Sequence, residues 1–365
     1  MDPTRFERRL ARAAARTAEL GAAGVIVAPS PDLEYLTGYD PMPLERPTLL
    51  VLRSGERPVL VVPMLERPLA LASPAVASLE LSAWRDRDDP YALAADLLPP
   101  GDVLVNDRIW GVHVLALQAA APRRGWTSAA PVVGWLRARK DPDELDALRR
   151  AAAAADAALA GLLATDLVGR TESEVAAALG DLLVAHGHTR AEFAIVAAGS
   201  HGASPHHEPT ARVLTTGEGL VLDFGGVLDS YYSDTTRTVS LGEPSARLRE
   251  VHAIVRAAQA AATGAVRPGV AIEEIDRAAR GVIEDAGYGD RFFHRTGHGI
   301  GLEVHEAPYA AAGDRTVLEP GMTFSVEPGI YLDGELGVRI EDIVAVTDHG
   351  VERLNRSPRD LLQVG

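Results

Sequence analysis

Two hairpin-like segments carry acidic residues inside strand-like apolar sequence, and this feature most limits the folds open to the chain. In the first, Asp223 directly follows the apolar run Leu220–Leu222, and Asp234 lies beyond a short connection. Residues suited to a turn stand between them at Asp229-Ser230. A hairpin folded there is expected to place Asp223 opposite Asp234 on one face of a sheet.

The second segment repeats this arrangement about one hundred residues later. Glu327 follows Phe324-Ser325-Val326, and Glu341 lies in the run Gly337–Asp342. The midpoint between the two glutamates falls on Asp333-Gly334, a dipeptide typical of two-residue hairpin turns. We therefore expect Glu327 and Glu341 to face each other across a second hairpin.

Two facing pairs of acids need a source of positive charge. Like charges opposite each other destabilise a hairpin, and burying them unpaired costs more. Four carboxylates carry four negative charges, which two divalent cations would balance, so the pattern predicts a dinuclear metal site. The alternative is four surface acids beside turns. The apolar neighbours of Asp223, Glu327 and Glu341 argue against it, because these strands read as buried.

Histidines are concentrated in two short segments bounded by glycine or proline. These segments hold five of the 11 histidines, namely His206, His207, His294, His298 and His305. His298 stands between two glycines, which we expect to let the backbone approach a ligand closely. An imidazole beside carboxylates is a common metal-ligand set.

The composition excludes several classes of function. The chain has 365 residues, enough for two domains, and contains no cysteine. Disulfides, thiolate nucleophiles, iron–sulfur clusters and cysteine-ligated zinc are therefore excluded. A net charge of −15 makes nucleic acid a poor partner. The N-terminus lacks the apolar core of a signal peptide, and no run is long enough to span a membrane. We expect a cytoplasmic protein with no membrane or nucleic-acid partner.

The pattern of apolar runs indicates two domains. Residues 1–134 alternate helical and strand-like sequence, with short apolar runs at Val25–Ala28, Thr48–Leu52, Val59–Val62 and Val103–Val105. Asp141, Pro142 and Glu144 then form a helix-start signal, and the helix is expected to end near Leu163. The boundary is predicted near residue 135.

The C-terminal domain contains an internal repeat. The sequence that starts at Gly169 is similar to the sequence that starts at Gly269, and Glu174, Ala178 and Gly187 recur as Glu274, Ala278 and Gly287. Each copy reads as a helix that ends in glycine and is followed by strands. Each half then contributes one of the two carboxylate pairs.

At this point the sequence resembles the pita-bread metallopeptidases, and within them the Xaa-Pro peptidases, prolidase and aminopeptidase P. The resemblance covers about residues 135–355 and is carried by the segments Ser204–His206, Ser233–Thr238, Gly297–Gly301, Val304–Glu306, Val326–Tyr331 and Val338–Asp342. Leu33–Tyr39 resembles the creatinase-type N-terminal domain. The resemblance implies an α+β protein. Its smaller α/β creatinase-type domain would span residues 1–134, and its pita-bread catalytic domain, with a pseudo-two-fold repeat, residues 135–365.

The resemblance also implies a role for each site residue. Asp223 would chelate one metal, Asp234 and Glu341 would bridge both, and His298 and Glu327 would hold the other. A hydroxide shared by metals about 3.5–4 Å apart would be the nucleophile, with Glu327 as base. His206 and His305 would bind the scissile carbonyl, and Arg339 would orient a ligand carboxylate or the substrate end. His206 is the first choice in this loop because it directly follows Pro205, and His207 is the alternative.

The implied reaction is hydrolysis of the Xaa-Pro imide bond in dipeptides or short peptides. That bond has no N–H for strand-like binding, so the enzyme needs a pocket shaped for the ring. Oxygen-rich ligands favour manganese, with cobalt or zinc as replacements. In the family the N-terminal domain often closes a neighbouring subunit's site, so a homodimer is expected. The short N-terminal domain favours a prolidase-like form.

Other activities on this scaffold compete with this interpretation. Creatinase uses the fold without metals and lacks most of the ligands that are present here. Methionine aminopeptidase would not need the 134 residues ahead of the catalytic domain. A metal-dependent hydrolase of another small amide fits the same ligands. A catalytically inactive peptide-binding protein typically loses ligands, and this chain keeps a full set.

Overall fold

The computed structural model describes residues 4–365, which form two compact units. The first unit is Met1–Arg137 and the second is Ala138–Gly365. They divide after helix α6 (Trp135–Arg137) because this short helix packs on α1 (Thr4–Glu19) and the helical turn Ala130–Gly134. None of the helices described in residues 4–365 has both the length and the apolar character that a membrane span requires.

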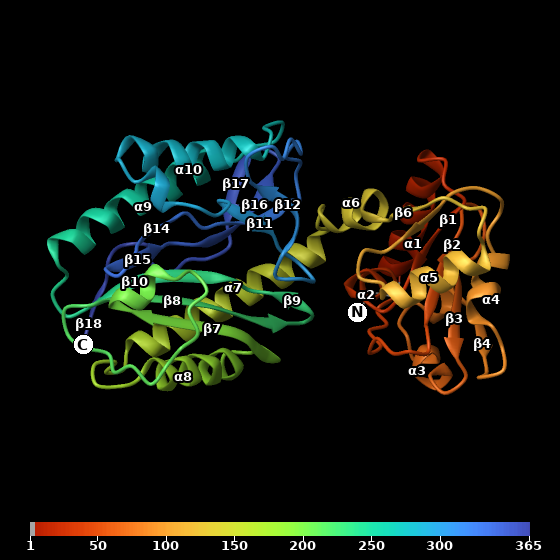
Figure 1. Ribbon diagram of the computed structural model, residues 1–365, viewed down its shortest axis with the longest axis horizontal. Coiled ribbons are helices and arrows are strands. Elements are labelled where there is room, and N and C mark those ends of the chain that lie inside the picture. The colour runs from red at the N-terminus through yellow and green to blue at the C-terminus, as the bar shows by residue number, and fades with distance from the viewer. Residues whose placement is uncertain (1–3) are drawn as a thin grey trace. The chain divides into compact units, whose positions relative to one another are not determined.

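The first unit is a six-stranded mixed sheet with helices around it (Figure 1). Its order is β4-β3-β2-β1-β5-β6. The strands are β1 (Gly24–Val27), β2 (Leu49–Leu52), β3 (Val59–Pro63), β4 (Glu80–Trp84), β5 (Val103–Val105) and β6 (Trp126–Ser128). Besides α1 and α6, the helices are α2 (Pro31–Thr37), α3 (Arg67–Leu71), α4 (Pro90–Asp96) and α5 (Gly111–Ala120).

The four apolar runs predicted as strands are confirmed as β1, β2, β3 and β5, which occupy the centre of this sheet. The two edge strands, β4 and β6, were not predicted. Most of their residues are exposed or only half-buried. They therefore lack the continuous apolar pattern that marks a strand buried on both faces.

The second unit contains four long helices and three small sheets. The helices are α7 (Pro142–Leu163), α8 (Glu172–Ala185), α9 (Ala246–Ala265) and α10 (Glu273–Asp285). The strands are β7 (Arg190–Ala198), β8 (Gly219–Leu228), β9 (Tyr231–Tyr232), β10 (Thr235–Leu241), β11 (Gly297–Gly299), β12 (Glu306–Ala310), β13 (Thr323–Val326), β14 (Gly329–Leu332), β15 (Leu336–Arg339), β16 (Asp342–Thr347), β17 (Gly350–Arg353) and β18 (Gln363–Val364). The predicted start of α7 is confirmed, since Asp141 and Glu144 form a capping box around Pro142.

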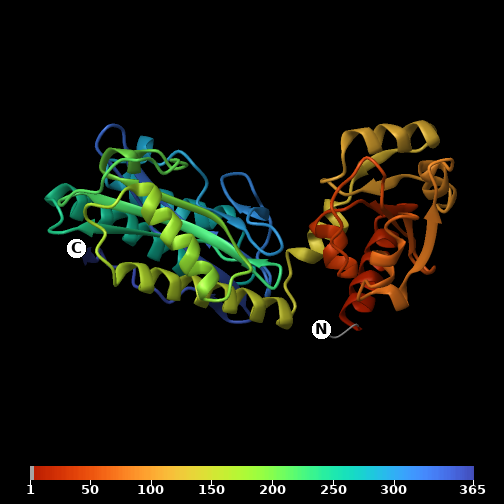
Figure 2. The same cartoon turned by 90° about the horizontal axis from the view of Figure 1, so that it is seen from below.

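The sheets of this unit lie between two pairs of helices, as Figures 1 and 2 show. One sheet has the order β18-β10-β8-β7, with β9 paired to β8, and the other has the order β12-β11-β13-β16-β17. Apolar side chains of α7 and α8 pack on the first sheet, and those of α9 and α10 pack on the second sheet and on the β14-β15 hairpin. The strands that carry or flank the site residues are therefore fixed on their outer faces by helix packing.

The predicted internal repeat is visible in the backbone of this unit. Gly169 and Gly269 both have positive φ angles, of 86° and 85°, just before α8 and α10. The next residues form matching isolated bridges, Thr171 to Val213 and Ala271 to Val317. Each half thus anchors the start of its second helix to a later segment in the same way.

Candidate metal centre

One cavity of about 870 Å³ in the second unit collects every predicted site residue. Its lining includes Asp223, Asp234, His298, Glu327, Glu341, His206, His305 and Arg339. His207, the alternative to His206, also lines it. The cavity therefore joins side chains from both halves of the repeat.

The first carboxylate pair lies on the β8–β10 hairpin, but its register differs from the prediction. Asp229 and Ser230 have positive φ angles, and Leu228 pairs with Tyr231, so these two residues form the turn as expected. With the turn centred there, Asp223 pairs with Thr236 rather than with Asp234. The expected direct pairing of Asp223 with Asp234 was wrong because the two acids do not lie at equal distances from the turn. Asp234 remains close to Asp223, since a shift of two residues keeps a side chain on the same face.

The second carboxylate pair has the predicted register. Gly329 pairs with Arg339 in the β14–β15 hairpin, and Val326 pairs with Asp342 between β13 and β16. Both pairings have the same centre, the turn at Gly334, which has a φ angle of 72°. Glu327 and Glu341 stand opposite each other in the break between these two ladders. Outside regular pairing, their side chains can converge on the cavity.

His298 lies on β11, and the glycines on either side of it are required by the neighbouring strands. A Cβ atom on Gly297 would lie 1.8 Å from the carbonyl oxygen of Ser325, and one on Gly299 would lie 2.5 Å from that of Ala307. The expectation that these glycines admit a ligand to the backbone was wrong. They instead let β11 fit closely between β12 and β13.

The ring of His298 is held for ligation through one nitrogen. Its Nδ1 lies 3.1 Å from the carbonyl oxygen of Gly299 and donates to it. Its Nε2 is then an acceptor, 3.5 Å from Asp234 Oδ2 and 3.3 Å from Glu327 Oε1. Burial, with the nearby His305 next in effect, lowers the pKa of His298 to about 3. A neutral imidazole fixed by a backbone carbonyl is the form that binds metals.

Three of the carboxylates, Asp234, Glu327 and Glu341, resist ionisation. Burial, followed by the charges of neighbouring carboxylates, raises the pKa of Asp234 and of Glu341 well above their usual values. Burial also raises the pKa of Glu327 to about 7, against the opposing charge of Arg339. Oε1 of Glu341 is buried and has no hydrogen-bond partner. A buried, unsatisfied oxygen among like charges is the arrangement that a divalent cation would relieve.

The ligand atoms fall into overlapping groups that fit hard divalent cations. One group is Asp223, Asp234 and Glu341, and another is His298, Glu327 and Glu341, with the atoms of each group within 4.8 Å of one another. A third group joins Asp234 and His298 to His305. The set is rich in carboxylate oxygen with one central imidazole, as manganese and similar ions prefer. The residues therefore fit the metals that the family resemblance implies.

Arg339 connects the carboxylate Asp223 of the candidate metal site to Tyr331. Its Nη2 donates to Asp223 Oδ2 at 2.6 Å, and its Nη1 donates to the hydroxyl of Tyr331 at 2.9 Å. The Tyr331 hydroxyl in turn lies 2.9 Å from Nε2 of His294. Burial raises the pKa of Tyr331 to about 12 despite Arg339, so the phenol stays neutral.

Sequence reasoning assigned no role to Thr236, Tyr331 or His294. The Thr236 hydroxyl lies 2.8 Å from Asp223 Oδ1 and 2.7 Å from Glu341 Oε2, and so links the two halves of the cluster. Thr236 and Tyr331 stand in the segments that carry the family resemblance, and His294 lies in the histidine-rich stretch. Their contacts span long sequence separations, which no local pattern shows.

The three histidines around the cluster differ in their partners. The ring of His305 lies 4.0 Å from the ring of His298, and burial lowers its pKa. Nε2 of His207 is bound to Glu172 at 2.9 Å. For His206, by contrast, no hydrogen bond to another described residue is found. Its ring is thus available to a molecule in the cavity.

Known proteins share both domains and the whole length of this chain. Residues 146–348 match metallopeptidase family M24, and residues 9–139 match the creatinase/prolidase N-terminal domain. The probable dipeptidase PepE of Mycobacterium tuberculosis is 45% identical over 98% of this chain and 96% of its own length. An Xaa-Pro dipeptidase of Lactobacillus helveticus is 36% identical over 90% of this chain and 91% of its own.

A solved structure agrees with the fold. The crystal structure of dipeptidase PepE from Mycobacterium ulcerans superposes with a TM-score of 0.97 at 44% identity, covering 100% of this chain and 99% of that one. The α+β architecture predicted from the motifs is confirmed, as is the resemblance to the pita-bread metallopeptidases. The chain belongs to metallopeptidase family M24, as an enzyme with a creatinase/prolidase N-terminal domain.

Proposed function

We propose that the protein hydrolyses the imide bond of Xaa-Pro dipeptides or short peptides that have proline in the second position. The observation that carries this proposal is the cavity in which five potential metal ligands meet His206, His305 and Arg339. The name of the Lactobacillus helveticus relative, Xaa-Pro dipeptidase, supports the choice of substrate.

We assign two divalent ions, with manganese as the first choice and cobalt or zinc as replacements, to the ligands Asp223, Asp234, His298, Glu327 and Glu341. Asp234, His298 and Glu341 each belong to two of the ligand groups, so these overlapping groups would hold the two ions close together. When bound, the ions would supply an activated water and polarise the scissile carbonyl.

The protein side chains would position the substrate and move the protons. Glu327 takes the proton of the attacking water and passes it to the proline nitrogen as the bond breaks. His206 and His305 donate to the carbonyl oxygen as it gains negative charge. Arg339 holds Asp223 in place through its 2.6 Å ion pair.

The apolar part of the cavity offers a surface for the proline ring. Phe193, Ile195, Phe293 and Val304 line it beside the polar groups. Because the imide nitrogen carries no proton, the substrate needs no hydrogen-bond acceptor at that position. Ring contact with an apolar wall would therefore select for proline.

We further propose that the enzyme acts in the cytoplasm as a homodimer. Its marked negative charge and lack of cysteine suit a soluble protein in a reducing compartment. Sedimentation would test the assembly, and a monomer at micromolar concentration would refute it.

The decisive experiment compares peptide substrates after metal removal. Protein treated with a chelator should lose hydrolysis of Xaa-Pro dipeptides and recover it when manganese is restored. Xaa-Ala dipeptides and longer Xaa-Pro peptides, assayed in parallel, would measure the preference for proline and for length. Absence of Xaa-Pro cleavage with metal restored would refute the proposal, and cleavage of Xaa-Ala alone would favour a general metal-dependent dipeptidase.

A further inference from the structure

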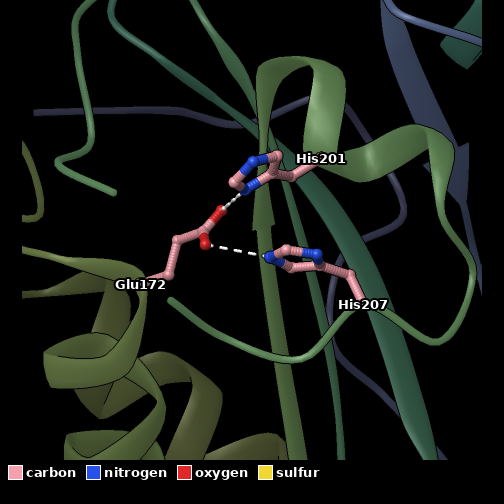
Figure 3. A group of neighbouring side chains, drawn as sticks. All are labelled: Glu172, His201 and His207. Atoms are coloured by element: carbon pink, nitrogen blue, oxygen red, sulfur yellow. Dashed lines mark hydrogen bonds and ion pairs between the residues drawn. The ribbon is translucent and has the colours of Figure 1, made fainter. Parts of the chain in front are cut away.

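A second cluster of ionisable side chains lies behind the loop that carries His206. Figure 3 shows the carboxylate of Glu172 facing the rings of both His201 and His207, with a dashed line to each. Glu172 is the first residue of α8, whereas both histidines belong to the segment that follows β7. The side chain of Glu172 is fully buried, and those of His201 and His207 are 33% and 13% exposed.

Every acceptor position of the Glu172 carboxylate is used. Oε1 accepts from the backbone N–H of Ala198 at 3.0 Å and from Nδ1 of His201 at 2.9 Å. Oε2 accepts from Nε2 of His207 at 2.9 Å. It also accepts from the backbone N–H and the hydroxyl of Thr210, at 3.1 and 2.8 Å. Because a carboxylate only accepts, each histidine must carry its proton on the nitrogen that faces Glu172.

This saturation distinguishes the cluster from a metal site. Glu172, His201 and His207 have the residue types and spacing of three metal ligands. The carboxylate, however, already has two or more donors on each oxygen, whereas Glu341 in the metal cluster keeps a buried oxygen without any. Burial by itself would raise the pKa of Glu172, but the hydrogen bonds from Ala198, His207, Thr210 and His201 lower it to about 2. The cluster is thus a satisfied network that joins a helix to a loop.

The network ends next to His206. Glu172 holds the ring of His207 on one side of this residue. On the other side, the carbonyl oxygen of Pro205 accepts from Nη2 of Arg339 at 3.3 Å. The same Arg339 nitrogen binds Asp223 in the metal cluster. His206 therefore lies between two residues with fixed contacts. His207 is hydrogen-bonded to Glu172 of α8, and Pro205 is hydrogen-bonded to Arg339, which also binds Asp223.

The loop has further support at its beginning but not at His206. The turn is closed by backbone bonds from Ser204 to His201 and from His207 to Ser204. A Cβ atom on Gly202 would lie 3.1 Å from the backbone nitrogen of Gly337, so the start of the loop lies closely against β15. No backbone hydrogen bond joins His206 itself to another described residue, so its neighbours Pro205 and His207 carry the contacts that hold this part of the loop.

We propose that Glu172 is a positioning residue that holds His201, His207 and Thr210 so that His206 presents its ring to the cavity. The inference rests on the proposed function, in which His206 binds the scissile carbonyl. It assigns to His207 a supporting role and to His206 the contact with substrate.

The test combines Glu172→Gln with His206→Ala in a double-mutant cycle on the metal-loaded enzyme. Glutamine keeps the shape of Glu172 but presents an amide donor to groups that are themselves donors. We expect kcat for an Xaa-Pro dipeptide to fall about tenfold, with KM and bound metal nearly unchanged. In the His206→Ala background the same change should cost less than about twofold, because the group it positions is gone. The matched control, Glu174→Gln on the exposed side of the same helix, should leave kcat unchanged.

Several outcomes would overturn the inference. An equal fall in kcat with and without His206 would show that Glu172 does not act through it. Loss of a metal equivalent in Glu172→Gln would show that the cluster binds metal. If Glu172→Gln does not fold, His207→Gln and His207→Leu replace it: glutamine can place an amide N–H near the position of Nε2 and should keep kcat, whereas leucine should lower it. Equal kcat in these two variants would contradict the inference.

A readout that needs no turnover separates this inference from the proposed function. In protein labelled in its histidine rings, Glu172→Gln should broaden or shift the NMR signals of His206 and leave those of His298 unchanged. Unchanged His206 signals would overturn the inference even in an active enzyme. If the wild type did not cleave Xaa-Pro peptides but Glu172→Gln still shifted the His206 signals, the proposed substrate would be refuted and the positioning role of Glu172 would be supported.

Discussion

Each half of the second unit has one buried carboxylate that accepts two hydrogen bonds from a single threonine, but the two threonines lie in segments that carry different site residues. In the first half, Glu172 accepts from the backbone N–H and the hydroxyl of Thr210. In the second half, Asp276 accepts from the backbone N–H and the hydroxyl of Thr296, at 3.1 and 2.8 Å. Each carboxylate lies in the first turn of its helix, α8 or α10, and each is almost fully buried.

The segments held by these two carboxylates differ. Glu172 holds the loop that contains His206, a residue with no role in the metal cluster. Asp276 holds Thr296, which lies two residues before His298 and whose carbonyl oxygen accepts from the N–H of Glu327. The position that corresponds to Glu172 in the second half is Ile272, a fully buried apolar residue. In the first half the buried carboxylate thus supports the loop of His206, and in the second half it supports the strand of His298.

The largest expected effect comes from removing a residue that belongs to two of the metal-ligand groups. Asp234→Asn should lower kcat at least a hundredfold and reduce bound metal, since even residues behind the ligands typically cost about 10–100-fold. Metal analysis and a dipeptidase assay measure both effects. Asp229→Asn, in the exposed turn of the same hairpin, is the control and should keep full activity. Normal metal content and turnover in Asp234→Asn would refute its assignment.

A weaker perturbation separates the two halves. Asp276→Asn should lower metal affinity about tenfold, because Thr296 then no longer fixes the strand of His298. Glu172→Gln should leave metal affinity unchanged. Titration of the metal-free proteins with manganese measures both. Asp285→Asn, at the exposed end of α10, is the control. If Glu172→Gln weakened metal binding as much as Asp276→Asn, the proposed division between the halves would be wrong.

The charge of Glu172 should also appear in the pH dependence of stability. Its pKa is lowered from 4.5 to about 2 in the folded protein, so its ionised form stabilises the fold fully above pH 4.5. This contribution, at most about 3 kcal/mol, is lost as the pH falls toward 2. The difference in urea midpoint between the wild type and Glu172→Gln should therefore shrink between about pH 7 and pH 3.5. A constant difference in urea midpoint over this pH range would show that the hydrogen bonds to Glu172 do not stabilise its ionised form.

The smallest expected effect concerns the start of α8. The Thr171 hydroxyl accepts from the N–H of Glu174, and the N–H of Thr171 donates to the Glu174 carboxylate, whereas α10 has no side-chain cap. Thr171→Ala should lower the free energy of unfolding by about 1 kcal/mol, and Thr171→Ser should restore it. Thermal unfolding measures both. An equally destabilising serine would show that the hydroxyl is not what stabilises this end of the helix.

Local signals in the sequence were sufficient to predict two turns and one helix start in the second unit. The turn at Asp229-Ser230 and the turn at Gly334 each form where the residues predicted them, because positive φ angles favour few residue types. The capping box at Asp141 marks the start of α7 for a similar local reason. The register of the first hairpin was misjudged by two residues, since the acids do not lie symmetrically about its turn.

Other features depend on segments that are distant in the sequence. Strands β4 and β6 lack a buried pattern and are recognisable only by their pairing with β3 and β5. For the histidine pair His206-His207, the sequence favoured His206 only because it directly follows Pro205. Only the position of Glu172 shows that the ring of His207 already has a partner.

Glu172 and Glu174 illustrate what the sequence determined and what the tertiary structure decided. Both stand at the start of a helix, and the sequence determined that helix and its cap, because capping involves residues within one turn. Glu174 stays in solvent and closes the capping box. Glu172 is buried because residues 26 to 38 positions later fold back over it and donate to its carboxylate. A local pattern cannot encode such distant donors, and so the tertiary structure alone decided which glutamate supports the loop beside the cavity.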